Sequence, residues 1–378
     1  MADNNENKVL NVPHLRFPEF TEEWEETTLG KISEITKGSG ISKDQLSEQG
    51  SPCILYGELY TKYKSEIIDE VYSRTELDSS SLVKSKANDV IIPCSGETAI
   101  DISTARCVPF NNILLGGDLN IIRLKHDDGG FFAYQLNGAR KKDIARVAQG
   151  VSVVHLYGEN LKHIRVYHPA IEEQKKITRL LSLIDERIAT QNKIIEKLQS
   201  LIKGLAVALT TKEKANIAIS QCLECHSSTL QESEVLSSGL CKVFGANGLV
   251  GYKDVPQMNG DAILVIKDGS GVGTVSYAQG KFSVIGTLNY LTVIGNNDLR
   301  YLYFALSVFN FQPYKTGMAI PHIYFKDYGN AKIFCPPLSE QKRIANVLGK
   351  LESKLCLEQN ILASFNLQKR YLLGQMFI

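Results

Sequence analysis

The feature that most restricts this sequence is a block that occurs twice, once in each half of the chain. Residues 150–177 read GVSVVHLYGENLKHIRVYHPAIEEQKKI, and residues 317–344 read GMAIPHIYFKDYGNAKIFCPPLSEQKRI. The copies align without a gap and share eight identical residues. Such a repeat predicts two similar halves with similar surfaces. We therefore expect a target or partner that itself has two parts.

Each copy leads into a heptad pattern. After Ile177, apolar residues recur at alternating steps of four and three, with one polar interruption at Gln191. This spacing predicts a helix from about Ile171 to Leu209, about 57 Å long. A helix of that length with one apolar stripe needs a partner, and the second copy supplies one, with breaks at Glu358 and Lys369. The predicted coiled-coil seam contains Ile177, Leu181, Ile184, Ile188, Ile195, Leu198, Ile202, Leu205, Ile344, Leu348, Leu351, Leu355, Leu362 and Phe365.

The remaining sequence consists of short apolar runs separated by Gly, Pro, Asn and Ser, which predicts two β-rich modules. One helix is expected within the first module, over Ala133–Val147. Landmarks recur in the same order in both modules, as in GGDLN at 116–120 and GTLN at 286–289. The spacing between matching landmarks shrinks along the chain, so the second module is the shorter. The modules should therefore share a strand order and differ in their loops.

Composition limits the class of protein. A chain of 378 residues suits two domains, and no apolar run approaches the roughly 20 residues that cross a bilayer. The polar start, MADNNENKVLNV, has no signal-sequence pattern. Eight cysteines without such a pattern suggest reduced thiols and a cytoplasmic location. A net charge of +1 argues against a strongly basic, non-specific nucleic-acid binder but leaves room for local basic patches.

Two motifs resemble cofactor sites. Cys222-Leu223-Glu224-Cys225-His226 has the spacing of c-type haem attachment, and its CxxC also fits zinc. Haem attachment needs export and zinc needs about four ligands, so we favour neither. The glycine-rich 269–273 segment resembles a nucleotide loop, but strands rather than a helix should follow it. A glycine-rich hairpin is the better interpretation.

Catalytic motifs are missing from the sequence. Cys335-Pro336-Pro337-Leu338 lacks the Asn and the aromatic residue of an adenine-methyltransferase element, and no Walker loop or serine nucleophile motif occurs. His155 and His322 recur in both halves, where a structural hydrogen-bonding role is the favoured interpretation. We therefore predict a non-catalytic chain without a metal or cofactor of its own.

Polar loop segments at predicted strand ends combine Lys and Tyr with small hydrogen-bonding residues. Such side chains suit contacts to phosphates and base edges, although ordinary solvated loops have a similar composition. The candidate DNA-binding residues are Lys37, Ser39, Tyr60, Lys62, Tyr63, Lys64, Ser95, Thr98, Gln149, Ser152, Asn247, Lys253, Lys267, Ser270, Thr274, Lys315 and Thr316.

Together these features resemble the specificity subunit of type I restriction–modification enzymes. The resemblance spans nearly the whole chain and includes LRFPEF at 15–20 with Trp24, YGELYTKY at 56–63, and FGANGLVGY at 244–252. Its most specific part is the Pro-x-x-x-Glu-Gln-Lys start of a long helix, present at Pro169 and Pro336.

The resemblance implies an α+β fold with a pseudo-two-fold internal repeat, in which the two long helices form an antiparallel coiled coil. Each β-rich module would be a target recognition domain for one half of a bipartite, asymmetric site in double-stranded DNA. Two modification subunits, which bind S-adenosylmethionine, and restriction subunits, which use ATP and Mg, would be the partners. The expected parts are a disordered tail (1–13), two target recognition domains (14–170 and 212–337) and two spacer helices (171–211 and 338–378).

Two alternatives remain open at this point. In the first, the chain is a coiled-coil adaptor that binds only proteins. In the second, which the missing motifs disfavour, it is itself an enzyme. No membrane association is expected.

Overall fold

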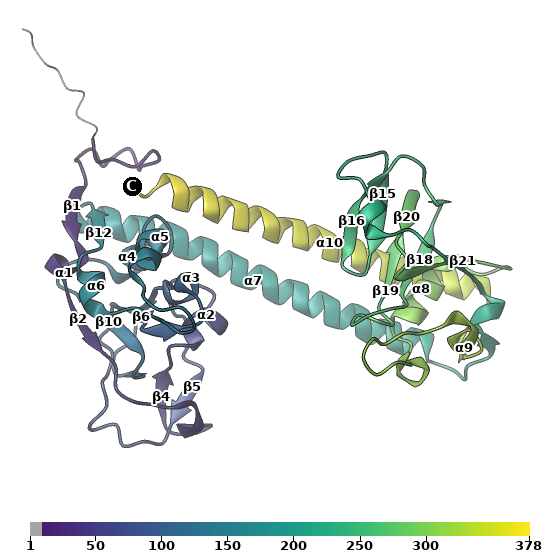
Figure 1. Ribbon diagram of the computed structural model, residues 1–378, viewed down its shortest axis with the longest axis horizontal. Helices are drawn as coiled ribbons and strands as arrows, with labels where there is room; N and C mark the ends of the chain where they lie inside the picture. Colours follow the sequence, from purple (N-terminus) through teal and green to yellow (C-terminus); the bar gives the residue numbers. More distant parts are fainter. Residues whose placement is uncertain (1–9) are drawn as a thin grey trace, which may run out of the picture. The chain divides into compact units, whose positions relative to one another are not determined.

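The computed structural model describes residues 10–378, and residues 1–9 of the expected tail lie outside the described residues. At the end of that tail, the Asn11 carbonyl accepts a hydrogen bond from the Trp24 backbone N–H (2.8 Å). The chain divides into two compact units (Figure 1). The first unit contains the residues up to Gln191 together with Ile361–Ile378, and the second is Asn192–Asn360. Each unit contains one β-rich module and part of both long helices, α7 (Ile171–Thr210) and α10 (Leu338–Gln375).

The first module is built on a four-stranded antiparallel sheet with the order β2-β10-β6-β8. A smaller sheet, β3-β5-β4-β9, lies over one face, and two-stranded ladders join β1 to β12 and β7 to β11. The elements are β1 (Glu25–Thr28), α1 (Leu29–Ile32), β2 (Ser33–Lys37), β3 (Leu46–Ser47), β4 (Ser51–Ile54), α2 (Glu58–Thr61), β5 (Ser73–Thr75), β6 (Asp89–Pro93), β7 (Ser95–Gly96), α3 (Ala99–Ile102), β8 (Arg106–Val108), β9 (Leu114–Leu115), β10 (Leu119–Leu124), α4 (Gly129–Asn137), α5 (Lys141–Val147), β11 (Val154–His155), α6 (Gly158–Lys162) and β12 (Arg165–His168).

The second module repeats this plan. Its central sheet has the order β14-β21-β18-β19, again antiparallel throughout, and a second sheet has the order β16-β15-β20-β17. In both modules the second sheet contains one parallel pair, β4 with β9 and β15 with β20. The elements are β13 (Ile217–Ala218), β14 (Leu223–Ser227), β15 (Cys241–Gly245), β16 (Gly248–Lys253), β17 (Met258–Asn259), β18 (Ala262–Ile266), β19 (Val275–Ala278), β20 (Lys281–Val284), β21 (Leu288–Val293), α8 (Leu299–Ser307), α9 (Phe325–Tyr328) and β22 (Lys332–Ile333).

Alternating side chains of the central sheet serve two cores. In the first module, Val90 and Ile92 face a core shared with α4 and the long helices, while Ile91 faces a core under the second sheet. In the second module, Ile263 and Leu264 divide in the same way. This two-residue period is what a strand buried on both faces requires. Each unit is therefore layered as helix pair, nine-residue helix, central sheet and second sheet.

One predicted helix is wrong in its limits. The expected helix over 133–147 is two helices, α4 (Gly129–Asn137) and α5 (Lys141–Val147). Gly138 ends α4 with φ −93° and ψ −101°, and its N–H donates to the Tyr134 carbonyl. A glycine can adopt this non-helical conformation at little cost, so it lets the chain turn between the two helices. By contrast, the glycine-rich 269–273 segment does connect an antiparallel hairpin, β18 with β19, as predicted.

The long helices pair within each unit. In the first unit, Ile177, Leu181 and Ile184 of α7 share a core with Leu372 of α10 and with Met376, which directly follows α10. In the second unit, Ala206 near the end of α7 shares a core with Ile344 and Leu348 near the start of α10. The start of each helix thus pairs with the end of the other, so the helices are antiparallel. All predicted seam residues are buried or half-buried: Ile177, Leu181, Ile184, Ile188, Ile195, Leu198, Ile202, Leu205, Ile344, Leu348, Leu351, Leu355, Leu362 and Phe365.

The repeated glutamine of the Glu-Gln-Lys motif joins each long helix to its module. Gln174 donates to the Pro169 carbonyl (2.8 Å), and its Oε1 accepts from the N–H of Asp128, which caps α4. Gln341 donates to the Pro336 carbonyl (2.8 Å), and its Oε1 accepts from the N–H of Asp298, which caps α8. Both glutamines are nearly inaccessible to solvent. The motif recurs because one buried amide satisfies the same backbone groups in both units.

Among the helices of residues 10–378, none combines the length and apolarity that crossing a bilayer demands.

Candidate nucleic-acid interface

In the first module, two loops predicted to bind DNA lie against each other. Strand β7 (Ser95–Gly96) pairs with β11 (Val154–His155), so the loop that starts at Ser95 adjoins the loop 149–155. Gln149 and His155 close the second loop with two reciprocal backbone hydrogen bonds of 2.8 and 2.7 Å. Thr98 follows on the first loop and caps the short helix α3. We call these two adjacent segments, 95–98 and 149–155, the first paired-loop surface.

The second module has an equivalent arrangement. Asp268 forms a bridge with His322, and the Gly269 N–H donates to the Pro321 carbonyl (2.9 Å). Thr316 and His322 close their loop with reciprocal bonds of 2.9 and 2.8 Å. The second paired-loop surface therefore consists of segments 267–274 and 316–322. It contains the candidates Lys267, Ser270, Thr274 and Thr316, and Lys315 adjoins it.

The repeated glycines of these loops have a shared geometric reason. Gly150 and Gly317 both have positive φ values, 116° and 86°. A Cβ atom at either position would lie 2.2 or 2.3 Å from a carbonyl oxygen across its own loop. Such contacts and dihedrals exclude a side chain. Both copies of the repeat therefore have glycine at this position because the two loops are closed by the same pattern of backbone hydrogen bonds.

The tips of both loops expose apolar side chains, a feature that the sequence analysis missed. Val151 is 96% and Met318 is 104% exposed, and these residues occupy the same position of the repeat. Val153 and Ile320, two residues further on, are also exposed. A matching pair of apolar tips is a signal that only the alignment of the two copies could have provided. Exposed apolar groups of this kind mark a contact surface.

Tyr60 extends the first paired-loop surface. A Cβ atom on Gly96 would lie 3.8 Å from the Tyr60 hydroxyl oxygen, so the hydroxyl borders this loop. Partial burial, followed by the nearby Tyr56, Glu97 and Asp101, raises the pKa of Tyr60. The phenol therefore keeps its proton near neutral pH and can donate a hydrogen bond.

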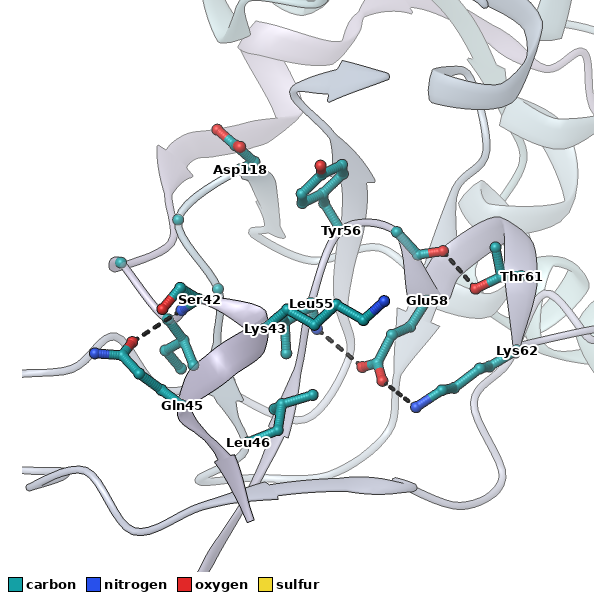
Figure 2. Close-up of a pocket in the computed structure, with 15 residues that line it drawn as sticks. Ser42, Lys43, Gln45, Leu46, Leu55, Tyr56, Glu58, Thr61, Lys62 and Asp118 are labelled. Carbon is teal, nitrogen blue, oxygen red and sulfur yellow. Dashed lines mark hydrogen bonds and ion pairs between the residues drawn. The ribbon is translucent and has the colours of Figure 1, made fainter. Parts of the chain in front are cut away.

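A cavity of about 880 Å³ opens beside α2 in the first module (Figure 2). On its wall, the buried Glu58 carboxylate accepts from the Leu55 N–H (3.0 Å) and from Lys62 Nζ (2.6 Å). Tyr56, Lys43 and Asp118 add polar groups, and the aliphatic part of the lining is Ile41, Leu46 and Leu55. The lining residues are Gly40, Ile41, Ser42, Lys43, Gln45, Leu46, Leu55, Tyr56, Gly57, Glu58, Thr61, Lys62, Gly116, Gly117 and Asp118.

Other candidates in the first module have structural partners. The Tyr63 side chain is buried and its ring stacks on Tyr72, so Tyr63 is a core residue and not a surface contact. The Ser39 hydroxyl accepts from the Val83 N–H (2.8 Å). Lys62 pairs with Glu58, whereas Lys64 is exposed. The ammonium of exposed Lys37 lies 6.0 Å from the Tyr157 ring.

Two candidates of the second module lie on the other sheet. Asn247 is exposed at the turn between β15 and β16, and half-buried Lys253 ends β16. They do not adjoin the second paired-loop surface through any strand pairing of the described residues. The candidates are thus brought together in part: within each module two candidate loops lie against each other, whereas Asn247 and Lys253 belong to a different sheet.

The Cys-x-x-Cys-His segment lies in and just before β14. Cys222 is buried, while His226 stacks on Tyr290 and its Nε2 lies 2.9 Å from the Thr292 hydroxyl. Within residues 10–378, no three His, Cys, Asp or Glu side chains are grouped so that they could hold a metal ion.

Comparison with known proteins identifies the family. The model of the type I restriction modification DNA specificity domain matches residues 21–200 and again residues 226–366. The two matches cover well over half of the chain, so this protein belongs to that family. Because the domain occurs twice, the predicted internal repeat and the resemblance to specificity subunits are both confirmed.

Individual relatives agree with this assignment. The type I restriction enzyme MjaVIII specificity subunit of Methanocaldococcus jannaschii is 25% identical over 202 residues, which are 52% of this chain and 44% of that protein. This chain aligns with less than half the length of the curated relatives that it matches.

Solved structures show the same fold. The S subunit of a type I restriction–modification system from M. genitalium superposes with a TM-score of 0.72 at 18% identity, covering 97% of this chain and 99% of that one. A chain from a study of complex assembly and conformational transition in the type I system gives a TM-score of 0.55 at 14% identity, covering 94% and 97%. The predicted fold class, α+β with two β-rich domains and a long helix between them, is therefore confirmed.

Proposed function

We propose that this chain is the non-catalytic DNA-recognition subunit of a cytoplasmic type I restriction–modification complex. Each β-rich module reads one half of a bipartite, asymmetric site in double-stranded DNA. The antiparallel helix pair sets the number of base pairs between the half-sites and carries the modification subunits.

The observation that carries this proposal is the pair of equivalent paired-loop surfaces on one repeated strand order. The first surface presents hydroxyls and the Gln149 amide, and the second presents Lys267 and hydroxyls, all at closed loops. Such groups suit contacts to phosphates and base edges. The scaffold repeats while the side chains differ, as in Gln149 against Thr316 and Ser95 against Asp268. Two modules of this kind would read two different sequences.

The outer faces of the long helices support the docking of partners. Besides the seam, both helices expose apolar side chains to solvent. Exposed apolar residues on a helix that already has a partner indicate a further protein contact. These residues are Leu183, Leu201 and Val207 on α7, and Val347, Leu357, Ile361, Leu367 and Tyr371 on α10.

In this proposal, all small-molecule chemistry belongs to other chains. Modification subunits bind S-adenosylmethionine and methylate adenine, and restriction subunits use ATP and Mg. This chain contributes binding and orientation, which is how a specificity component directs a reaction that it does not perform. The absence of nucleophile, Walker and methyltransferase motifs in its sequence agrees with that division.

The second candidate function is a coiled-coil adaptor that binds only proteins. The exposed apolar positions on the long helices favour it as much as they favour docking in a DNA-reading complex. The paired-loop surfaces favour the DNA reader, because a protein adaptor does not require two equivalent closed loops that present hydroxyl, amide and lysine groups.

Selection from random-sequence DNA separates the two. The full chain, assembled with its modification subunits, would be incubated with random duplexes, and the bound fraction sequenced. The DNA-recognition function predicts two short conserved blocks at one fixed separation. Recovery of unselected sequences by a well-assembled complex would favour the adaptor.

A further inference from the structure

Each long helix carries an acidic side chain at the same position of the internal repeat. Asp185 in α7 follows Gly150 at the same spacing at which Glu352 in α10 follows Gly317. The Tyr134 hydroxyl, on α4, donates to Asp185 Oδ2 (2.7 Å). The Tyr303 hydroxyl, on α8, donates to Glu352 Oε1 (2.7 Å). In both units, therefore, the long helix accepts a tyrosine hydroxyl from the nine-residue helix of its own module.

A cation completes the first of these contacts. Lys369 Nζ, on α10, lies 2.6 Å from Asp185 Oδ1 and 2.5 Å from Glu66 Oε2. The three side chains are only 14%, 8% and 10% exposed. Lys369 is one of the two charged residues that interrupt the heptad seam. Its contacts account for the interruption, because a buried lysine is tolerated only where carboxylates pair with it.

A cation also completes the second contact, but from a different helix. Arg300, on α8, pairs with Glu352, and its guanidinium lies 4.3 Å from the centre of the Tyr277 ring. The Arg300 and Glu352 side chains are 30% and 23% exposed. Both units thus tie module to long helix with an acid, a tyrosine and a cation, and the first tie is the more buried.

The first tie reaches the segment that borders the paired loops. The Ser65 hydroxyl donates to Asp185 Oδ2 (3.0 Å), and Arg106 donates to the Tyr63 carbonyl (2.9 Å). Segment 60–64 therefore lies between two anchored carboxylates, Glu58 and Glu66. Its Tyr60 hydroxyl borders the first paired-loop surface.

We propose that the Asp185–Lys369–Glu66 and Arg300–Glu352 contacts are positioning sites, each of which holds one module in a fixed orientation on its part of the helix pair. In this proposal these groups do not contact DNA themselves. They act through the loops, because hydrogen-bond readout of bases tolerates displacements of only about 0.5 Å. Loss of one tie should relax base discrimination in one half-site and leave the other intact. This inference rests on the proposed function.

Two single variants test the assignment in the full chain assembled with its modification subunits. Lys369→Met removes the first cation, and Glu352→Gln removes the second acid. Sequencing of N6-methyladenine would give a mismatch ratio for each half-site. This is the methylation of sites with one mismatch in that half-site, divided by the methylation of the cognate site. Lys369→Met should raise this ratio at least tenfold in one half-site only. Glu352→Gln should raise it in the other half-site, by less, because Glu352 is more exposed. The matched control is Arg370→Met, an exposed cation next to Lys369, which should change neither ratio.

A general loss of stability would look different. It would lower methylation at all sites and leave base discrimination unchanged in both half-sites. If Lys369→Met impairs folding, a triple variant replaces it, in which Lys369→Met is combined with Asp185→Asn and Glu66→Gln. This variant removes the tie without leaving an unpaired carboxylate. It should relax base discrimination in the same half-site.

The assignment is overturned if the single and combined variants lower methylation uniformly, or if both ties affect the same half-site. A wild-type methylome without a bipartite site would instead overturn the proposed function, so the two failures can be told apart.

Discussion

Replacing Arg16 by methionine should destabilise the first unit by about 3 kcal/mol. Arg16 Nε and Nη2 donate to the two carboxylate oxygens of Glu173, at 2.7 Å each. Glu173 is 1% exposed, so methionine would leave a buried carboxylate without its cation. Breaking a buried pair in this way costs about 3–5 kcal/mol. The lower end applies because a cavity of about 640 Å³, lined by both side chains, gives water access to the site.

The assay uses the single tryptophan of the sequence. Trp24 is 2% exposed in the core of the first unit, 5.5 Å from the Phe131 ring, so its emission reports the unfolding of this unit. With a urea dependence of about 2 kcal/mol/M, the midpoint should fall by about 1.5 M. Lys162→Met is the matched control: it breaks a 2.6 Å pair with Glu159 whose side chains are 41% and 78% exposed. That change should cost less than about 1 kcal/mol.

A double variant separates charge burial from lost packing. Arg16→Met combined with Glu173→Gln removes the unpaired charge and should recover part of the lost stability. The reasoning is refuted if Arg16→Met lowers the midpoint no more than Lys162→Met does. It is also refuted if the double variant is no more stable than Arg16→Met alone.

Three further predictions concern assembly, specificity and pH. Ile188→Lys places a charge in the seam of the helix pair and should weaken binding of the modification subunits, measured by size-exclusion chromatography. Any complex that still assembles should methylate the same bases, so an altered sequence preference would contradict this prediction. Exchange of segment 94–98 should change one half-site in the methylome, and alteration of both would refute modular reading. Asp127→Asn should cost about 1.5–3 kcal/mol near pH 5.5 by removing the 3.1 Å contact with His168, and less at pH 8.5. A larger cost at pH 8.5 in the Trp24 assay would contradict it.

The sign of the pH effect follows from both partners. The hydrogen bond with Asp127 raises the pKa of His168, although burial opposes it. Burial also opposes the shift at Asp127, but hydrogen bonds from His168 and Gln174 lower the pKa of that carboxyl. The contact between His168 and Asp127 therefore contributes its full stabilisation to the folded protein at pH values between the ordinary pKa values of the two groups. It is lost as the pH rises through the raised pKa of His168, and as it falls through the lowered pKa of Asp127.

The long helices could be predicted closely from the sequence because a heptad pattern is local. The expected start at Ile171 is the observed one, and the helix ends at Thr210 rather than Leu209. The hairpin at 269–273 could be predicted for the same reason, because the residues next to it in the sequence indicate that a strand and not a helix follows. Gly138 shows the limit of local signals. Helix-forming residues on both sides of it predict one continuous helix, although Gly138 has a non-helical conformation that ends α4.

Contacts between distant residues could not be predicted. Lys369 was visible only as a break in the seam, because its partners Glu66 and Asp185 belong to much earlier parts of the sequence. Sequence composition groups Tyr63 with the polar residues around it, but its ring is buried and stacks on Tyr72. The DNA-contact role of the remaining candidates stays a prediction.

The first unit includes residues 361–378, so it is discontinuous in the chain, whereas the second unit is the single segment Asn192–Asn360. A ribosome therefore synthesises the whole of the second unit before it synthesises the last part of the first. Met376 and Phe377 belong to the same core as Trp24, so that core is completed only after the whole second unit has been translated. A premature stop near codon 360 should consequently harm the module at the opposite end of the gene and leave its nearer neighbour folded.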